Sequence, residues 1–256
     1  MKNTSYLWTI SLIGCFLLLC TGTSRSEPAV NHSLYGDLLA KHVKAGRVNY
    51  RTFKNEEKRL DKYLKLLDET DPDTLSRNEQ FAFYINAYNA CTIKLILQHY
   101  PGIQSIKDIG SWWSTPWKIK FCKIGGKTYS LDQIEHNILR PRFKDPRVHF
   151  AINCASKGCP TLISEPYQGS ILDQQLDEST RAFINDPEKN RLEGNTLYVS
   201  KIFKWFKDDF DGDIAVFFSN YADKNLKNTL SDKKSQINIK YLNYDWSLNE
   251  SAGTSK

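Results

Sequence analysis

Apolar residues recur at helical spacing along most of the chain. Intervals of three and four positions, which place apolar side chains on one helix face, occur in six segments: residues 34–43, 56–67, 76–100, 130–140, 172–184 and 201–210. The third segment is apolar on most sides, which predicts a buried helix. It begins with Ser76 and Glu79 at the spacing of a capping box, and Pro101 follows its predicted end.

Short segments between these helices have the pattern of strands. Gly125-Gly126 is a two-residue hairpin signal between two of them. In residues 147–153, apolar and polar side chains alternate, which predicts a strand with one polar face. The predicted strands are residues 118–124, 127–130, 147–153, 195–200 and 237–246. We therefore expect an α+β fold, a helix-rich single domain with a small, mostly antiparallel sheet.

The N-terminus has the composition of an export signal. Lys2 precedes an apolar run from Leu7 to Cys20, and Ser24-Arg-Ser26 has the small-x-small pattern of a cleavage site. The run is shorter than the about 20 residues that span a bilayer. We expect cleavage, no remaining membrane span, and a secreted or periplasmic protein; the alternative is a membrane anchor made by this segment. The predicted divisions are a signal peptide, an N-terminal helical region, a core domain and a disordered tail: residues 1–26, 27–75, 76–249 and 250–256.

Composition excludes some classes of partner. The chain is 40% hydrophobic and 25% charged, which is ordinary for a globular domain. The net charge of +6 is spread along the chain rather than gathered in a basic run, so we expect no nucleic-acid partner. No glycine-rich phosphate-binding loop lies at a predicted strand–helix junction. We expect no cofactor, and the oligomeric state stays open.

Three polar residues fall on predicted buried helix faces. Asn86 and Asn89 lie three residues apart in the long helix. An unsatisfied buried amide costs about 1–3 kcal/mol, so these two either hold neighbouring loops or form the polar floor of a ligand site. In the next helix Glu135 lies on the apolar side and needs a charged or hydrogen-bonding partner. His136 is directed elsewhere, towards Arg140.

The predicted strand at 147–153 leads into a pair of thiols. Its polar face carries Arg147 and His149, and a Ser-Lys-Gly turn then separates Cys154 from Cys159. Histidine beside thiol is typical of nucleophilic catalysis, metal ligation or a disulfide. Of the six cysteines, two lie in the predicted signal, and the remaining four permit up to two disulfides in three pairings.

Motifs in a fixed order resemble the domain of unknown function 547 family. They are Phe81–Ala90, Ser130–His136 with Leu139–Arg140, Asp145–Cys154, Gly158–Pro160, Lys204–Phe210 and Tyr241–Asn249. The resemblance covers most of the mature chain and implies a fold but no activity, because the family's role is unassigned. The motif residues that carry over are Asn86, Asn89, Glu135, His136, Arg140, Arg147, His149, Cys154 and Cys159. Cys91 and Cys122 lie outside the pattern and are either unpaired core thiols or one local disulfide.

The first functional hypothesis is a cysteine-dependent hydrolase or acyl transferase acting on an amide, ester or thioester. His149 would lower the pKa of the Cys154 or Cys159 thiol from about 8.5, and Glu135 would orient the imidazole. Arg147 or the backbone of the turn would hold an oxyanion. A long buried helix beside a small sheet bearing His also resembles the papain and transglutaminase layout. In that layout the nucleophile begins the helix, and here Asn86 lies nearer to that place than any cysteine.

The alternative is a non-catalytic module that binds a small molecule or peptide and carries a structural Cys154–Cys159 disulfide. The cationic side chains Arg140, Arg147 and His149 predict an anionic ligand. The predicted substrate-binding residues are Arg140, Arg147, Asn86, Asn89 and His136. A zinc site of His136, His149 and the two cysteines is the weakest hypothesis, because the histidines are far apart in sequence, and no metal is predicted. The state of two sulfurs decides between these hypotheses.

Overall fold

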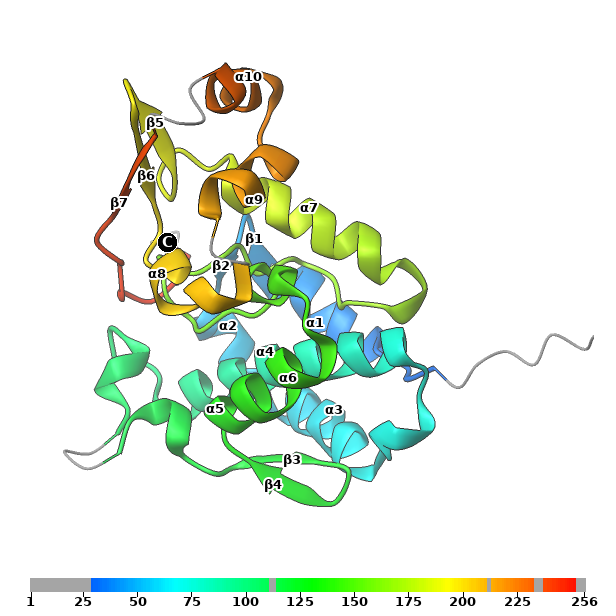
Figure 1. The fold of residues 1–256 in the computed structure, drawn as a ribbon. Helices are drawn as coiled ribbons and strands as arrows, with labels where there is room; N and C mark the ends of the chain where they lie inside the picture. The colour runs from blue at the N-terminus through cyan, green and yellow to red at the C-terminus, as the bar shows by residue number, and fades with distance from the viewer. Residues whose placement is uncertain (1–28, 111–113, 211–212, 233–236, 252–256) are drawn as a thin grey trace, which may run out of the picture.

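The computed structural model describes residues 29–110, 114–210, 213–232 and 237–251 (Figure 1). The predicted signal peptide, residues 1–26, and residues 252–256 of the predicted tail lie outside the described residues. Within the described part of the chain, no helix combines the length and the apolar character needed to cross a membrane.

The first of two hydrophobic cores is built around helix α4 (Arg77–His99). The Ser76 side chain accepts a hydrogen bond from the Glu79 N–H, and the helix ends before Pro101, as the sequence predicts. Almost every side chain from Gln80 to Leu97 is buried. Other elements that contribute side chains to this core are α1 (Ser33–His42), α2 (Tyr50–Lys54), α3 (Glu57–Glu69) and the hairpin of β3 (Cys122–Ile124) and β4 (Lys127–Tyr129). A Cys91–Cys122 disulfide joins α4 to this hairpin, which resolves the state of these two cysteines.

The second core lies at the other end of the molecule in Figure 1 and is rich in phenylalanine. Helix α7 (Leu172–Ile184) belongs to both cores, because Leu172 and Leu176 pack into the first, and Phe183 and Ile184 into the second. The other elements of this half are β5 (Arg191–Glu193), β6 (Thr196–Val199), α8 (Ile202–Trp205), η7 (Lys207–Phe210), α9 (Ile214–Tyr221), α10 (Lys224–Asp232) and β7 (Asn238–Tyr241).

The strands form small separate sheets. β1 (Val43–Lys44) pairs antiparallel with β2 (Arg47–Val48), and β3 pairs antiparallel with β4 around Gly125-Gly126, as the hairpin signal predicts. In the third sheet β6 lies between β5, its antiparallel neighbour, and β7, its parallel neighbour. The α+β prediction is confirmed, whereas the papain-like layout stays a prediction.

The strand predicted at residues 147–153 is wrong. Residues Pro146–Phe150 form a 3₁₀ helix, η5, which begins with Pro146 at its first position. The Asp145 side chain accepts a hydrogen bond from the Arg147 N–H at 2.9 Å and caps the turn. Val148 is buried in the first core and Phe150 in the second. The alternating pattern thus arises because the segment runs between two cores, not because it lies on a sheet.

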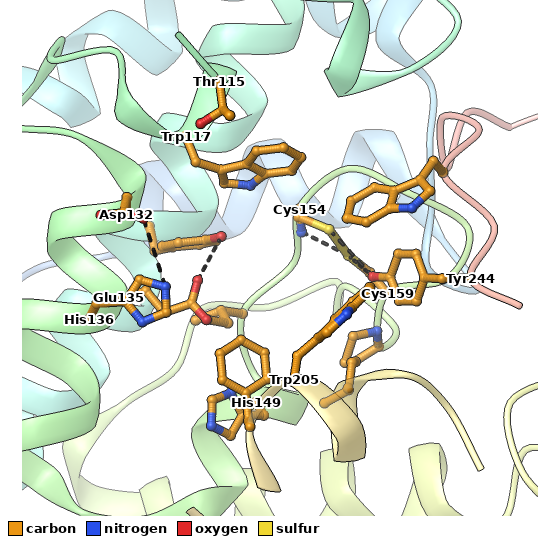
Figure 2. A pocket seen from close by; sticks show the side chains of 16 residues that line it. Thr115, Trp117, Asp132, Glu135, His136, His149, Cys154, Cys159, Trp205 and Tyr244 are labelled. Carbon is orange, nitrogen blue, oxygen red and sulfur yellow. Dashed lines mark hydrogen bonds and ion pairs between the residues drawn. A yellow bond between two sulfur atoms is a disulfide. The ribbon is translucent and has the colours of Figure 1, made fainter. Parts of the chain in front are cut away.

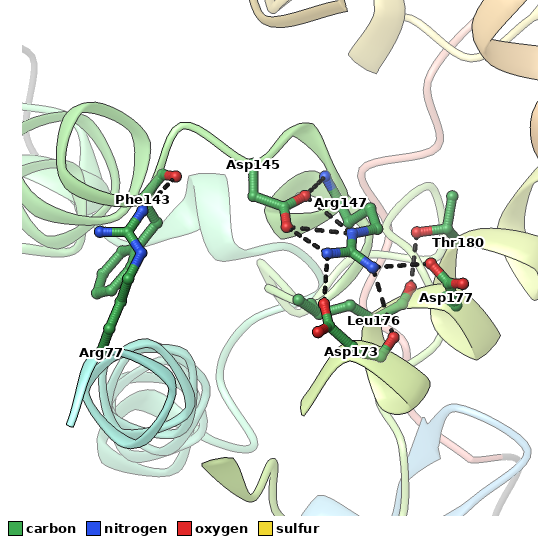
Figure 3. A network of polar contacts seen from close by, with 8 residues as sticks. All are labelled: Arg77, Phe143, Asp145, Arg147, Asp173, Leu176, Asp177 and Thr180. Atoms are coloured by element: carbon green, nitrogen blue, oxygen red, sulfur yellow. Dashed lines mark hydrogen bonds and ion pairs between the residues drawn. The ribbon is translucent and has the colours of Figure 1, made fainter. Parts of the chain in front are cut away.

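Arg147 links this turn to α7 (Figure 3). Its guanidinium donates to Asp145 at 2.6 Å, to Asp173 at 2.8 Å and to Asp177 at 2.8 Å. The hydrogen bonds to Asp145 are the main cause that raises the pKa of Arg147, so the guanidinium stays charged. Three carboxylates therefore compete with any further anion for this one cation.

The two amides of α4 each hold a loop against the helix. The Asn86 side chain donates to Tyr167 O at 2.8 Å and accepts from Tyr167 N at 2.9 Å. The Asn89 side chain donates to Ala151 O at 3.0 Å and accepts from Asn153 N at 2.8 Å. Both amides are buried with donor and acceptor engaged, which is the first of the two interpretations offered for them.

We expect Asn89→Ala to lower the free energy of unfolding by about 2–4 kcal/mol, because it leaves a buried carbonyl and a buried N–H without partners. Urea unfolding followed by circular dichroism measures this loss. Asn78→Ala, an exposed position on the same helix, is the matched control and should change stability by about 0.5 kcal/mol or less. Equal losses in the two variants would contradict the assignment.

Candidate functional site

A cavity of about 240 Å³ opens where the two cores meet (Figure 2). Its wall combines the helix that follows β4, the loop after η5, helix α8 and the C-terminal segment. Aromatic side chains line much of it: Tyr88, Trp117, Trp205, Phe206, Tyr244 and Trp246. The polar part of the wall contains Asp132, Glu135 and His136 on one side in Figure 2, and the Cys154–Cys159 disulfide on the other. No lysine or arginine lines the cavity among the described residues.

Glu135 lies on an irregular helix. Ser130 and Gln133 form the predicted capping box of α5 (Leu131–Gln133), which continues as a π-helical segment, η4 (Ile134–Leu139), and then as α6 (Arg140–Phe143). The Arg140 N–H bonds to the Glu135 carbonyl, five residues earlier, which widens the helix at this point. Such π segments often occur at functional sites.

The Glu135 carboxyl is buried with little compensation. Its side chain has one hydrogen-bond partner among the described residues, the Tyr88 hydroxyl, which donates at a long 3.4 Å. Burial is the main cause that raises the pKa of Glu135, to about 7, against a smaller lowering by the nearby Arg140 charge. A carboxyl that is half-ionised near neutral pH can both donate and accept a proton.

His149 is buried beneath the aromatic wall and forms a pair with Asp209. Its Nε2–H donates to Asp209 at 2.6 Å, its ring stacks on Phe206 at 4.0 Å, and Nδ1 has no hydrogen-bond partner. Burial lowers the pKa of His149, so the imidazole is neutral near pH 7. The carboxylate of Asp209 also accepts two hydrogen bonds from Arg140, at 2.6 and 2.9 Å.

His136 and Arg140 complete the network on the helix side. Arg140 donates to His136 Nδ1 at 2.9 Å, and His136 Nε2 lies 3.8 Å from Asp132. Burial lowers the pKa of His136. The hydrogen bonds from His149 and Arg140 hold the pKa of Asp209 well below its usual range. The ionised carboxylate of Asp209 therefore offsets the charge of Arg140 and orients the His149 imidazole.

Hydrogen-bond donors converge on Cys159 of the disulfide. Its Sγ lies 2.9 Å from the Cys154 N–H, 3.1 Å from the Tyr244 hydroxyl and 3.3 Å from the Ser156 hydroxyl. Cys154 is partly exposed in the cavity, whereas Cys159 is only 6% exposed. The same two hydroxyls also lie 3.4 and 3.5 Å from Cys154 Sγ, so Cys159 differs from Cys154 in having shorter contacts and one further donor, the Cys154 N–H. Donors around a sulfur stabilise its thiolate.

The loop that carries the disulfide has an unusual backbone conformation. Ala155 has a φ of +61°, in the left-handed region that a residue with a Cβ adopts at a cost of about 1–2 kcal/mol. The Asn153 side chain accepts from the Ala155 N–H at 2.8 Å and donates to Pro160 O at 2.7 Å. The Asn249 N–H donates to Ala155 O at 3.0 Å, so the C-terminal segment also fixes this turn.

The structure brings together five of the nine residues singled out in the sequence. The cavity wall contains Glu135, His136, His149, Cys154 and Cys159. The other four are Asn86, Asn89, Arg140 and Arg147, and none of them is part of this wall. Neither nitrogen of His149 bonds to a sulfur among the described contacts, and the catalytic and binding roles of all nine stay predictions.

Sequence reasoning missed most of the aromatic wall and Asp209. Trp205 and Asp209 lie within the motif at 204–210, and Tyr244 and Trp246 lie within the motif at 241–249. These motifs support the family resemblance, but they do not indicate a chemical role for the four residues. In the part of the chain that the structure describes, no cluster of three His, Cys, Asp or Glu residues is arranged to hold a metal ion.

We expect Glu135→Gln to remove a pH dependence of stability. The folded protein keeps a proton on Glu135 that the unfolded chain releases, so wild-type stability falls as pH rises from about 4.5 to about 7. The shift corresponds to at most about 3 kcal/mol. Urea unfolding at pH 4.5, 6 and 8 should show the wild type losing stability relative to Glu135→Gln. The surface variant Glu193→Gln should follow the wild type, and parallel curves for all three proteins would refute the assignment.

Comparison with known proteins assigns a family to the middle of the chain. Residues 72–184 match the model of a family described as "Protein of unknown function, DUF547". The match includes α4, the Glu135 helix and the disulfide loop, whereas Trp205, Tyr244 and Trp246 lie beyond it. Searches of curated proteins and of solved structures found no match. Through residues 72–184, the chain belongs to the DUF547 family.

Proposed function

We propose that the cavity is a thiol-dependent catalytic site that carries out thiol–disulfide exchange through Cys154 and Cys159. The observation that carries the proposal is the unequal environment of the two sulfurs. Three donors lie 2.9–3.3 Å from Cys159 Sγ, and two of them lie farther from Cys154 Sγ, at 3.4 and 3.5 Å. The partly exposed Cys154 lines the cavity. A good leaving group in exchange is a stabilised thiolate, and the attacked sulfur must be accessible.

The reaction would convert a small dithiol to its disulfide. A thiolate of the substrate attacks Cys154 Sγ, the Cys154–Cys159 bond breaks, and its electron pair stays on Cys159 as a thiolate. The second thiol of the substrate then attacks its own sulfur in the mixed disulfide and releases Cys154 as a thiolate. The protein gains the two electrons that the substrate loses, and the substrate's two thiol protons pass to Glu135 and to solvent. The reverse exchange with a second small-molecule disulfide would re-form the Cys154–Cys159 bond and complete the turnover.

Glu135 suits the proton transfers because its pKa, raised by burial to about 7, matches neutral pH. It lies across the cavity from the disulfide in Figure 2, on a helix fixed by its capping box. We further propose that the protein is exported, since oxidising compartments preserve disulfides such as those at Cys91–Cys122 and Cys154–Cys159.

The reduced protein offers a second candidate function, the hydrolysis or acyl transfer expected from the sequence. The partly exposed Cys154 would be the nucleophile and Glu135 the proton acceptor, because both line one cavity. His149 is bound to Asp209 and stacked on Phe206, so it fits a supporting position better than that of the base. The non-catalytic module with a structural disulfide is the outcome if neither sulfur reacts.

The two cysteines should differ in reactivity. We expect the Cys159→Ser variant, which keeps the Cys154 thiol, to react with 2,2′-dithiodipyridine at pH 7 at least about tenfold faster than Cys154→Ser, because Cys159 is buried. Release of thiopyridone gives the rates, and mass spectrometry identifies the modified cysteine. Equal rates, or a faster Cys154→Ser variant, would reverse or remove the assigned roles. Two inert variants would leave the disulfide purely structural.

Glu135 should control the pH profile of exchange. We expect dithiothreitol to reduce Cys154–Cys159 faster in the wild type than in Glu135→Gln, by a ratio that grows between pH 6 and 8 and then stays constant. The pH-dependent ionisation of dithiothreitol affects both rates equally, so it cancels in their ratio. Alkylation after quenching counts the thiols, and Glu193→Gln is the control. A ratio independent of pH would rule out Glu135 as the proton acceptor.

A further inference from the structure

Two acidic side chains, Asp132 and Glu135, line the cavity and offer carboxylate oxygens that accept hydrogen bonds. Glu135 has a single long contact with Tyr88, and Asp132 lies beside it on the same wall. The neutral His149 adds an Nδ1 lone pair without a partner beneath that wall. An acidic wall of this kind is satisfied by a ligand that brings N–H donors and positive charge.

The cations of this region are already engaged outside the cavity. Arg140 donates to Asp209 and to His136, and Arg147 donates to three aspartates near α7. Because no lysine or arginine lines the cavity among the described residues, an anionic group would meet carboxylates without a compensating cation. The anionic ligand expected from the sequence therefore has the less favourable electrostatics.

The aromatic wall also favours a cation. Indole and phenol faces attract cations through their quadrupoles, and Trp is the strongest of them. Trp246 already has the Lys107 ammonium 4.0 Å from its ring centre. Trp205, Tyr244 and Trp246 pack against one another at 4.6–5.7 Å between ring centres and form a continuous aromatic surface beside the disulfide. Trp205 is 45% exposed, which leaves part of it free for a ligand.

We propose that this cavity binds an organic cation with N–H donors, such as an amidinium, guanidinium or ammonium group, between the carboxylates of Asp132 and Glu135 and the aromatic surface of Trp205, Tyr244 and Trp246. This inference rests on the proposed function in one respect: it assigns a positive charge to the dithiol substrate of the exchange reaction. Binding itself requires no sulfur chemistry, so it can be tested separately.

Cation binding should be linked to the ionisation of Glu135. The groups that influence Glu135 electrostatically are Asp132, Arg140, Tyr88, Asp209 and Tyr244. His136 and His149 line the same cavity. The pKa values of His136 and His149 are lowered by burial, and those of Tyr88 and Tyr244 are raised by it. Asp209 stays ionised in this range. Glu135, with a pKa of about 7, therefore titrates across the pH range from 6 to 8.

The test uses the full oxidised chain and two probes of similar shape, benzamidine, which is cationic, and benzamide, which is neutral. We expect benzamidine to bind at least about tenfold tighter than benzamide at pH 8, by calorimetry or tryptophan fluorescence. Its affinity should rise by up to about tenfold from pH 6 to pH 8, in step with the ionised fraction of a carboxyl with a pKa of about 7.

Variants separate the parts of the proposal. Glu135→Gln should lose the pH dependence and most of the preference for benzamidine, and Trp205→Leu, at an exposed position, should weaken benzamidine more than benzamide. Glu193→Gln should bind as the wild type does. Equal affinities for the two probes, no binding of either, or a preference that survives Glu135→Gln would each overturn the inference.

A double Cys154→Ser, Cys159→Ser variant distinguishes this inference from the proposed function. If it keeps the preference for benzamidine while wild-type exchange is absent, the cation site stands and the exchange chemistry fails. If exchange proceeds while benzamidine and benzamide bind alike, the chemistry stands and the cation site fails.

Discussion

Asn89 fixes the backbone on which the disulfide loop depends. Its amide bonds the carbonyl of Ala151 and the N–H of Asn153, so α4 determines where the loop leaves η5. The side chain of Asn153 then sets the turn at Ala155 and the return at Pro160. A left-handed alanine is tolerated there because hydrogen bonds from both sides over-determine its conformation. The position of two sulfurs thus follows from a buried amide on a neighbouring helix.

Asp209 has the corresponding role in the electrostatics. This carboxylate binds Arg140 and His149 together, so neither of these groups presents free positive charge to the cavity. Arg147 is likewise surrounded by three aspartates. Once these cations are neutralised, Asp132 and Glu135 determine the charge of the wall. The raised pKa of Glu135 follows, because burial disfavours its ionised form more than the nearby Arg140 favours it.

Local signals in the sequence predict the elements well and the site only in part. Ser76, Ser130 and Gly125-Gly126 mark helix starts and a hairpin through chemistry confined to a few residues. The prediction of a strand at residues 147–153 is wrong because alternation of apolar and polar residues also arises when a segment lies between two cores. The aromatic wall could not be predicted either, since Trp205 and Tyr244 meet the disulfide only through tertiary packing.

The hydroxyls beside the disulfide are also held by contacts other than those with its sulfurs. Tyr244 packs on Trp205 and Trp246, and Ser156 is held by the bridge between its backbone and Leu248. Both hydroxyls would therefore stay close to Cys159 after the bond opens. Preorganised donors of this kind stabilise the reduced form and make a disulfide more oxidising. The same hydroxyls lie 3.4 and 3.5 Å from Cys154 Sγ, farther than from Cys159 Sγ, so this stabilisation would favour Cys159 as the leaving thiolate of the proposed exchange.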